Sequence, residues 1–158
     1  MDPSEWLAGF RITHQQARDG KLKPEERARY LAMREEFARS LVAAQGLTVP
    51  EGQQARRYFR VAQIFPLEVN NLYNTVTKEL SRSGFSALIT GALKEGDRVE
   101  FKLTLARAAE PLTGQAKVVS VVRQAGNSRV SFAIESMKEA DAERLELALF
   151  DAVLARFG

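Results

Sequence analysis

The chain alternates strictly between apolar and polar side chains at Val99-Glu100-Phe101-Lys102-Leu103-Thr104-Leu105. Because successive side chains of a strand point to opposite faces, this pattern predicts a strand with one buried and one solvated face. The turn sequence Lys94-Glu95-Gly96-Asp97 comes directly before it. One-sided burial of this kind is typical of antiparallel sheets.

Similar short β-prone segments fill the chain after residue 56. The candidate strands are residues 61–69, 75–79, 85–90, 98–105, 113–122 and 128–134. Gly126-Asn127 separates the last two and predicts a hairpin. Short strands with antiparallel signals favour a small barrel, so we expect a mainly β fold: a six-stranded antiparallel β-barrel with flanking helices.

Residues 1–46 are predicted to form an α-helical hairpin. Trp6 and Phe10 recur at helical spacing, and Asp19-Gly20 makes a turn. A narrow apolar stripe follows at Tyr30, Met33, Phe37, Leu41 and Ala44. This stripe is either the seam against the first helix or a dimer interface. His14 lies in a polar helical run, where we expect it to be solvated.

A further helix is predicted at the end of the chain. Ser136-Met137-Lys138-Glu139 has the spacing of a capping box. One apolar face follows it, made of Ala142, Leu145, Leu149, Val153 and Phe157. The helix is expected to cover the barrel or to join a second subunit. The predicted organisation is a helical hairpin at 1–46, a linker at 47–55 and a barrel with its C-terminal helix at 56–158.

Composition excludes several classes of function. The 158 residues include no cysteine and one histidine, which excludes disulfides, thiolate catalysis and multi-histidine metal sites. There is no phosphate-binding loop of the G-x-x-x-x-G-K type, and we expect neither enzymatic activity nor a cofactor. No apolar run approaches the roughly 20 residues of a membrane-spanning helix, and the acidic start is unlike a secretory signal. We therefore expect a cytoplasmic protein without membrane insertion.

Positive charge is concentrated in the middle of the chain. Residues 56–136 carry twelve Lys or Arg and seven Asp or Glu, a balance of +5, whereas the whole chain carries +3. The densest point is Arg56-Arg57-Tyr58-Phe59-Arg60. Guanidinium groups offer planar donor forks that match phosphates and guanine edges. Taken alone, this motif is more often a solvated basic run, and nucleic acid is not the expected partner.

A second polar motif is Glu79-Leu80-Ser81-Arg82-Ser83-Gly84, between two candidate strands. The carboxylate of Glu79 could accept paired N–H donors or hold a guanidinium. The hydroxyl of Ser81 could cap backbone amides or accept a hydrogen bond from a ligand, and Gly84 permits a positive φ or a close backbone approach. Taken alone, this motif is more often an ordinary polar turn.

Together the two motifs resemble the PilZ family of cyclic di-GMP receptors, which carries R-x-x-x-R at the barrel entry and an acidic-x-Ser-x-x-Gly turn about twenty residues later. Further similarity lies in Leu93-Lys94-Glu95-Gly96-Asp97-Arg98-Val99 and in Ala116-Lys117-Val118-Val119. The resemblance covers about residues 54–157. It implies a six-stranded barrel with a C-terminal helix and cyclic di-GMP as the ligand.

The resemblance also implies roles for individual residues. Arg56 and Arg60 would engage guanine edges and phosphates, and Arg57 would add a charge-assisted or stacking contact. Ser81 and Gly84 would shape the opposite side of the pocket. Ligand binding would fold the arginine-bearing loop onto the barrel and change the orientation of the N-terminal hairpin. The family suggests outputs in motility, biofilm formation or polysaccharide production through a protein partner that the sequence does not identify.

Glu79 departs from the family, which usually has Asp or Asn at this position. The extra methylene moves the carboxylate by about 1.5 Å. A misaligned buried hydrogen bond costs on the order of 1–3 kcal/mol, or about ten- to a hundredfold in affinity. The sequence favours retained binding. The alternative is a degenerate PilZ-like domain that binds no nucleotide and serves as a protein interaction or homodimerisation module. Binding of single-stranded nucleic acid at an Arg/Tyr/Phe rim is a third reading.

Overall fold

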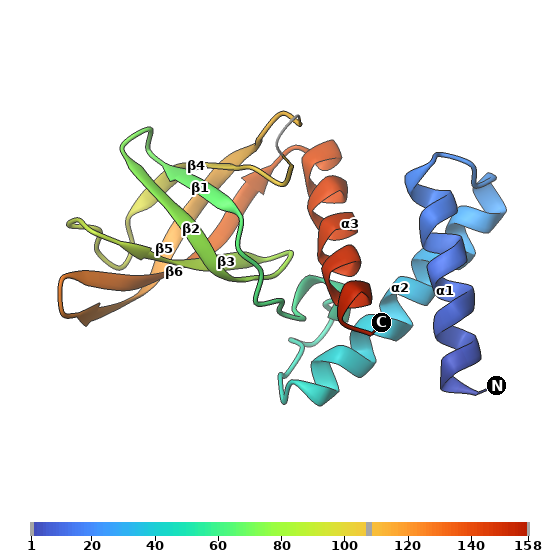
Figure 1. The fold of residues 1–158 in the computed structure, drawn as a ribbon. Coiled ribbons are helices and arrows are strands. Elements are labelled where there is room, and N and C mark those ends of the chain that lie inside the picture. Colours follow the sequence, from blue (N-terminus) through green and yellow to red (C-terminus); the bar gives the residue numbers. More distant parts are fainter. Residues whose placement is uncertain (1, 107–108, 158) are drawn as a thin grey trace. The chain divides into compact units, whose positions relative to one another are not determined.

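A computed structural model describes residues 2–106 and 109–157 of the chain. The chain forms two compact units, Met1–Phe59 and Arg60–Phe157 (Figure 1). The first unit is helical, and the second contains the β-strands and the last helix. No α-helix in the described ranges is long and apolar enough to cross a bilayer.

The helical unit contains α1 (Pro3–Arg18), α2 (Pro24–Ala44) and a short 3-10 helix, η1 (Ala55–Arg57). Each α-helix begins with a proline, whose fixed φ suits the first turn. The Asp2 carboxylate accepts a hydrogen bond from the Ser4 backbone N–H (3.1 Å). Glu26 likewise accepts one from the Lys23 backbone N–H (3.0 Å). Satisfied amides at both starts confirm helices on either side of the predicted turn.

Aromatic rings form the core between α1 and α2. Phe10 is fully buried, stacks on Tyr30 (centroids 5.9 Å apart) and meets Phe37 edge-on (5.2 Å). These two contacts place part of the predicted stripe in the seam between the helices. The expectation that His14 is solvated is wrong: it is 3% exposed, and its Nδ1 shares a hydrogen bond with the Tyr30 hydroxyl. The Arg34 guanidinium, also buried, lies over the Tyr30 ring, 4.5 Å from its centroid.

The second unit is a closed barrel of antiparallel strands in the order β1-β2-β3-β6-β5-β4. The strands are β1 (Pro66–Val69), β2 (Tyr73–Leu80), β3 (Gly84–Ile89), β4 (Arg98–Leu103), β5 (Leu112–Gln124) and β6 (Asn127–Met137). In β4, buried and exposed side chains alternate, as the sequence pattern predicts. The expected fold class is therefore confirmed.

Stacked aromatic rings also fill the barrel interior. Phe85 of β3 lies 5.0 Å from Phe132 of β6 and 5.2 Å from Phe101 of β4, between ring centroids. Gly114 pairs with Phe101 across β4 and β5, and a Cβ there would come within 2.9 Å of the Phe101 ring. The glycine therefore leaves the space that the ring occupies.

The chain enters the barrel differently from the prediction of one strand at 61–69. Val61 forms an isolated antiparallel bridge with Leu80, and β1 begins only at Pro66. Between them, the buried Thr77 hydroxyl donates to the Gln63 carbonyl (2.7 Å) and accepts from the Phe65 N–H (2.9 Å). The Thr77 N–H also donates to the Phe65 carbonyl (3.0 Å), so both the side chain and the backbone of Thr77 attach the segment to β2.

The last helix, α3 (Glu139–Arg156), is fixed to the barrel at both ends. Asp141 accepts a hydrogen bond from the Thr113 N–H of β5 (3.3 Å), and Arg156 donates to the Ala62 carbonyl (2.8 Å). The predicted apolar face is buried at Ala142, Leu145, Leu149 and Val153, whereas Phe157 is 56% exposed.

The capping box predicted at the start of this helix is wrong. Ser136 belongs to β6 and is paired with Gln115 of β5. Sheet pairing therefore holds Ser136 in an extended conformation, and Lys138 takes the N-cap position without a side-chain hydrogen bond.

Candidate ligand site

The turn between β2 and β3 is organised by Ser81. Its Oγ accepts hydrogen bonds from the backbone N–H groups of Ser83 (3.2 Å) and Gly84 (3.1 Å). The Ser81 N–H donates to the Gly84 carbonyl (2.8 Å) and closes the turn. The hydroxyl therefore serves the turn itself, as expected of a serine that caps backbone amides.

Gly84 is required by a close approach of two strands rather than by its φ. A Cβ built at this position would lie 2.2 Å from the Phe132 carbonyl oxygen and 3.3 Å from the Phe132 carbonyl carbon, both in the backbone of β6. Gly84 pairs with Ala133 at the start of the β3–β6 ladder. Only a residue without a side chain lets the turn run this close to β6.

Arg60 lies beside this turn. The backbone bridge between Val61 and Leu80 (N···O 2.8 and 2.9 Å) continues the antiparallel register to Arg60 and Ser81. The Arg60 guanidinium reaches the Glu79 carboxylate, with NH1 3.8 Å from Oε1. Three of the predicted residues therefore lie together around the β2–β3 turn, next to Gly84: Arg60, Glu79 and Ser81.

The other carboxylate oxygen of Glu79 faces an arginine that lies outside both sequence motifs. Arg129 of β6 lies with NH2 3.7 Å from Glu79 Oε2. Only the strand order, which places β3 between β2 and β6, brings these two residues together. An isolated arginine in a strand gives no motif, so the sequence alone offers no signal for it.

A buried serine lies between these two strands. Ser86 of β3 pairs with Glu79 on one side and with Ser131 on the other, so the three side chains share one face of the sheet. Ser86 is 6% exposed, and within the described ranges its Oγ has no hydrogen-bond partner. A buried hydroxyl without a partner is uncommon in proteins.

Arg56 and Arg57 belong to the helical unit, in η1. Glu35 of α2 accepts hydrogen bonds from the backbone N–H groups of Ala55 (2.8 Å) and Arg56 (3.1 Å). The Arg56 Nε donates to Gln54 Oε1 (3.1 Å), and Arg57 is exposed. The backbone that carries these arginines is thus anchored to α2, at one end of a short connection to Arg60.

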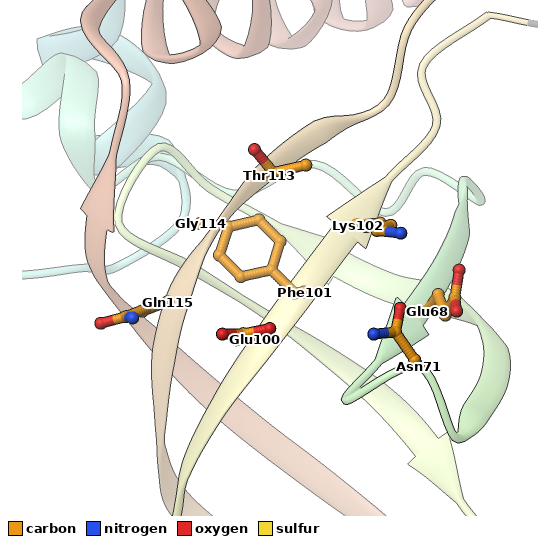
Figure 2. A pocket seen from close by; sticks show the side chains of 8 residues that line it. All are labelled: Glu68, Asn71, Glu100, Phe101, Lys102, Thr113, Gly114 and Gln115. Atoms are coloured by element: carbon orange, nitrogen blue, oxygen red, sulfur yellow. The ribbon is translucent and has the colours of Figure 1, made fainter.

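A pocket of about 320 Å³ lies elsewhere on the barrel (Figure 2). Its lining comes from β1, β4, β5 and the β1–β2 turn: Glu68, Asn71, Glu100, Phe101, Lys102, Thr113, Gly114 and Gln115. No predicted site residue lines it. Among the described residues, no group of three or more histidines or carboxylates could hold a metal ion.

The closed barrel with an arginine at its entry, beside a Glu-x-Ser-x-x-Gly turn, defines a barrel of the PilZ type. The chain belongs to the PilZ family, because the PilZ domain family matches residues 53–151. This confirms the resemblance inferred from the two motifs. None of the curated proteins matches the chain.

Solved structures share this fold. The inhibitor of motility MotI/DgrA of Bacillus subtilis is 11% identical with a TM-score of 0.57, covering 70% of this chain and 58% of its own. The PilZ domain of YcgR from Escherichia coli, solved with c-di-GMP, is 18% identical with a TM-score of 0.51, covering 64% and 93%. A second YcgR structure with c-di-GMP is 21% identical with a TM-score of 0.52, covering 64% and 46%.

Proposed function

We propose that the chain is a cyclic di-GMP receptor without enzymatic activity of its own. The observation that carries this proposal is the placement of Arg60 against Glu79 at the Ser81–Gly84 turn of a PilZ barrel. The PilZ domain of YcgR, a structural relative, was solved with c-di-GMP. The combination of guanidinium donors and a carboxylate suits a ligand made of phosphates and guanines.

Each residue of the proposed site has a defined chemical task. Arg60 provides a donor fork for a phosphate or for the O6 and N7 atoms of guanine. Arg56 and Arg57 add two permanent positive charges from the connecting segment. The Glu79 carboxylate accepts hydrogen bonds from the N–H groups of a guanine. Ser81 and Gly84 keep the β2–β3 turn close to β6. The surface of this turn is then available to the ligand.

The anchoring of the arginine segment suggests how binding becomes a signal. The amides of Ala55 and Arg56 are bonded to Glu35, so a ligand that draws Arg56 and Arg57 toward itself also acts on α2. Ordering the connecting segment costs conformational entropy, which the ligand contacts must offset. The resulting change in the helical hairpin would alter contact with a protein partner, and motility, biofilm formation or polysaccharide production are the outputs to examine.

Ligand-dependent protection of backbone amides tests this arrangement. Cyclic di-GMP is expected to slow hydrogen exchange in residues 54–60 and in the turn at 81–84, because ligand contacts would make local opening of their existing hydrogen bonds less frequent. Strand β4 is the internal control, since it lines the pocket of Figure 2 and carries no proposed ligand contact. GTP at equal concentration controls for nucleotides in general. Protection of β4 without protection of 54–60 would place the site at the pocket of Figure 2 instead.

The second reading, a degenerate domain that acts through protein contacts, has one observation in its favour. The Glu79 carboxylate already lies between two guanidinium groups and neutralises the arginine proposed to meet the ligand. If that neutralisation has abolished binding, the shorter Asp of other family members should restore it.

Glu79→Asp is therefore expected to separate the two readings. In a working receptor, the variant should bind cyclic di-GMP with an affinity within about tenfold of the wild type, because the ion pairs that the shorter side chain would lengthen or break are exposed and weak. Calorimetric titration of both proteins measures this difference. A wild type without measurable binding beside a binding Glu79→Asp protein would establish the degenerate domain instead.

A further inference from the structure

Two arginines from distant parts of the sequence converge on one carboxylate. Arg60 precedes the barrel, Arg129 lies on β6, and each faces a different oxygen of Glu79, at 3.8 and 3.7 Å. Both positive groups therefore lie within reach of a single small anion. In this structure that anion is the side chain of Glu79.

We propose that Arg129 is a further ligand-binding residue, and that Arg60 and Arg129 form one anion position that takes a phosphate of the cyclic dinucleotide. The phosphate replaces the Glu79 carboxylate between the two guanidinium groups. Glu79 then becomes available to the N–H donors of a guanine. This inference rests on the proposed function, and it adds a contact from β6 that the two sequence motifs do not contain.

The existing ion pairs are weak enough to be exchanged. The side chains of Arg60, Arg129 and Glu79 are 60%, 46% and 35% exposed. Their N···O separations also exceed the usual length of a charge-assisted hydrogen bond. Exposed pairs of this kind contribute little to stability. A phosphodiester offers oxygens to both donor forks and can bind each guanidinium at a shorter distance.

The sheet register supports this position. Arg129 lies two residues before Ser131 on β6, so both side chains project from the same face, which also carries Glu79 and Ser86. Within the described part of the chain, the buried Ser86 hydroxyl has no hydrogen-bond partner. The Ser86 hydroxyl is a neutral donor on the same face as Glu79 and Arg129. It lies on β3, between the strands that carry those two residues.

Arg129→Ala tests the inference, with Arg123→Ala as the matched control. Arg123 is an exposed arginine of β5 that pairs in register with Ser128, next to Arg129, so both variants remove one positive charge from the same region. In calorimetric titration, we expect Arg129→Ala to bind cyclic di-GMP at least about tenfold more weakly than the wild type. The affinity of Arg123→Ala should change by less than about twofold. The double variant Arg60→Ala/Arg129→Ala should lose less affinity than the product of the two single fold-changes, because both residues would bind the same phosphate.

The outcomes distinguish this inference from the function on which it rests. Wild-type protein that binds no cyclic di-GMP would overturn both. Wild-type binding with equal affinities for Arg129→Ala and Arg123→Ala would overturn the role of Arg129 alone. Arg129→Gln provides the same comparison if the alanine variant melts at a lower temperature, since it keeps most of the side chain without its charge. Weaker binding by Arg129→Gln, at an unchanged melting temperature, would support the role of Arg129.

Discussion

Arg60→Ala is expected to weaken cyclic di-GMP binding by about ten- to a hundredfold. Hydrogen bonds to charged groups contribute roughly 1.5–3 kcal/mol, and each 1.4 kcal/mol corresponds to about a tenfold change in affinity. The loss of stability should be small, because the ion pair between Arg60 and Glu79 is exposed and such pairs contribute about 0–1 kcal/mol. Isothermal titration measures the affinity, and urea unfolding measures the stability.

Arg98→Ala is the matched control for this variant. Arg98 also forms an exposed ion pair with a glutamate, Glu135, and its side chain is 72% exposed, compared with 60% for Arg60. Both substitutions remove one arginine and break one surface pair, but Arg98 carries no proposed ligand contact. An Arg60→Ala protein that binds as tightly as Arg98→Ala and the wild type would refute the arginine contact.

Gly84→Ala is expected to destabilise the barrel. The added methyl carbon would lie 2.2 Å from the Phe132 carbonyl oxygen, so β3 and β6 would have to separate where their ladder begins. Overpacking of this kind costs roughly 1–3 kcal/mol. Hydrogen exchange in β3 and β6 should therefore accelerate, and cyclic di-GMP binding should weaken because the Ser81 turn shifts with the strand.

Gly9→Ala provides the control for adding the same methyl group. Gly9 lies in α1, and a Cβ there would meet no atom within 4 Å apart from its chain neighbours and the backbone of its own helix. Alanine favours a helix over glycine by about 0.5–1 kcal/mol, so this variant should be as stable as the wild type or more stable. Equal exchange rates in β3 and β6 for Gly84→Ala and Gly9→Ala would show that the close approach to Phe132 does not constrain the barrel.

The sequence predicts the barrel well because its signals are local. The turn at Gly126 and the alternation in residues 99–103 depend on neighbouring residues only, and both are found in the structure, although the predicted strand at 98–105 ends at Leu103. The entry at 61–65 was predicted less well. There, the segment is attached to β2 partly by the hydroxyl of Thr77, and propensity along residues 61–65 gives no sign of this distant side chain.

Features that depend on long-range packing were missed. His14 and Arg34 belong to polar patterns in their own helices, yet both are buried around Tyr30. Arg129 lies beside Glu79 only because β2, β3 and β6 are neighbours in the closed barrel. By contrast, the contact of Arg60 with Glu79 joins the two motifs on which the family resemblance was based.

Calorimetric titration of the wild-type chain with cyclic di-GMP, at physiological salt and with GTP as the control, tests the central proposal most directly. We expect saturable heat with cyclic di-GMP and none with GTP. Absence of heat with cyclic di-GMP up to hundreds of micromolar, from protein with a cooperative melting transition, would contradict the receptor function.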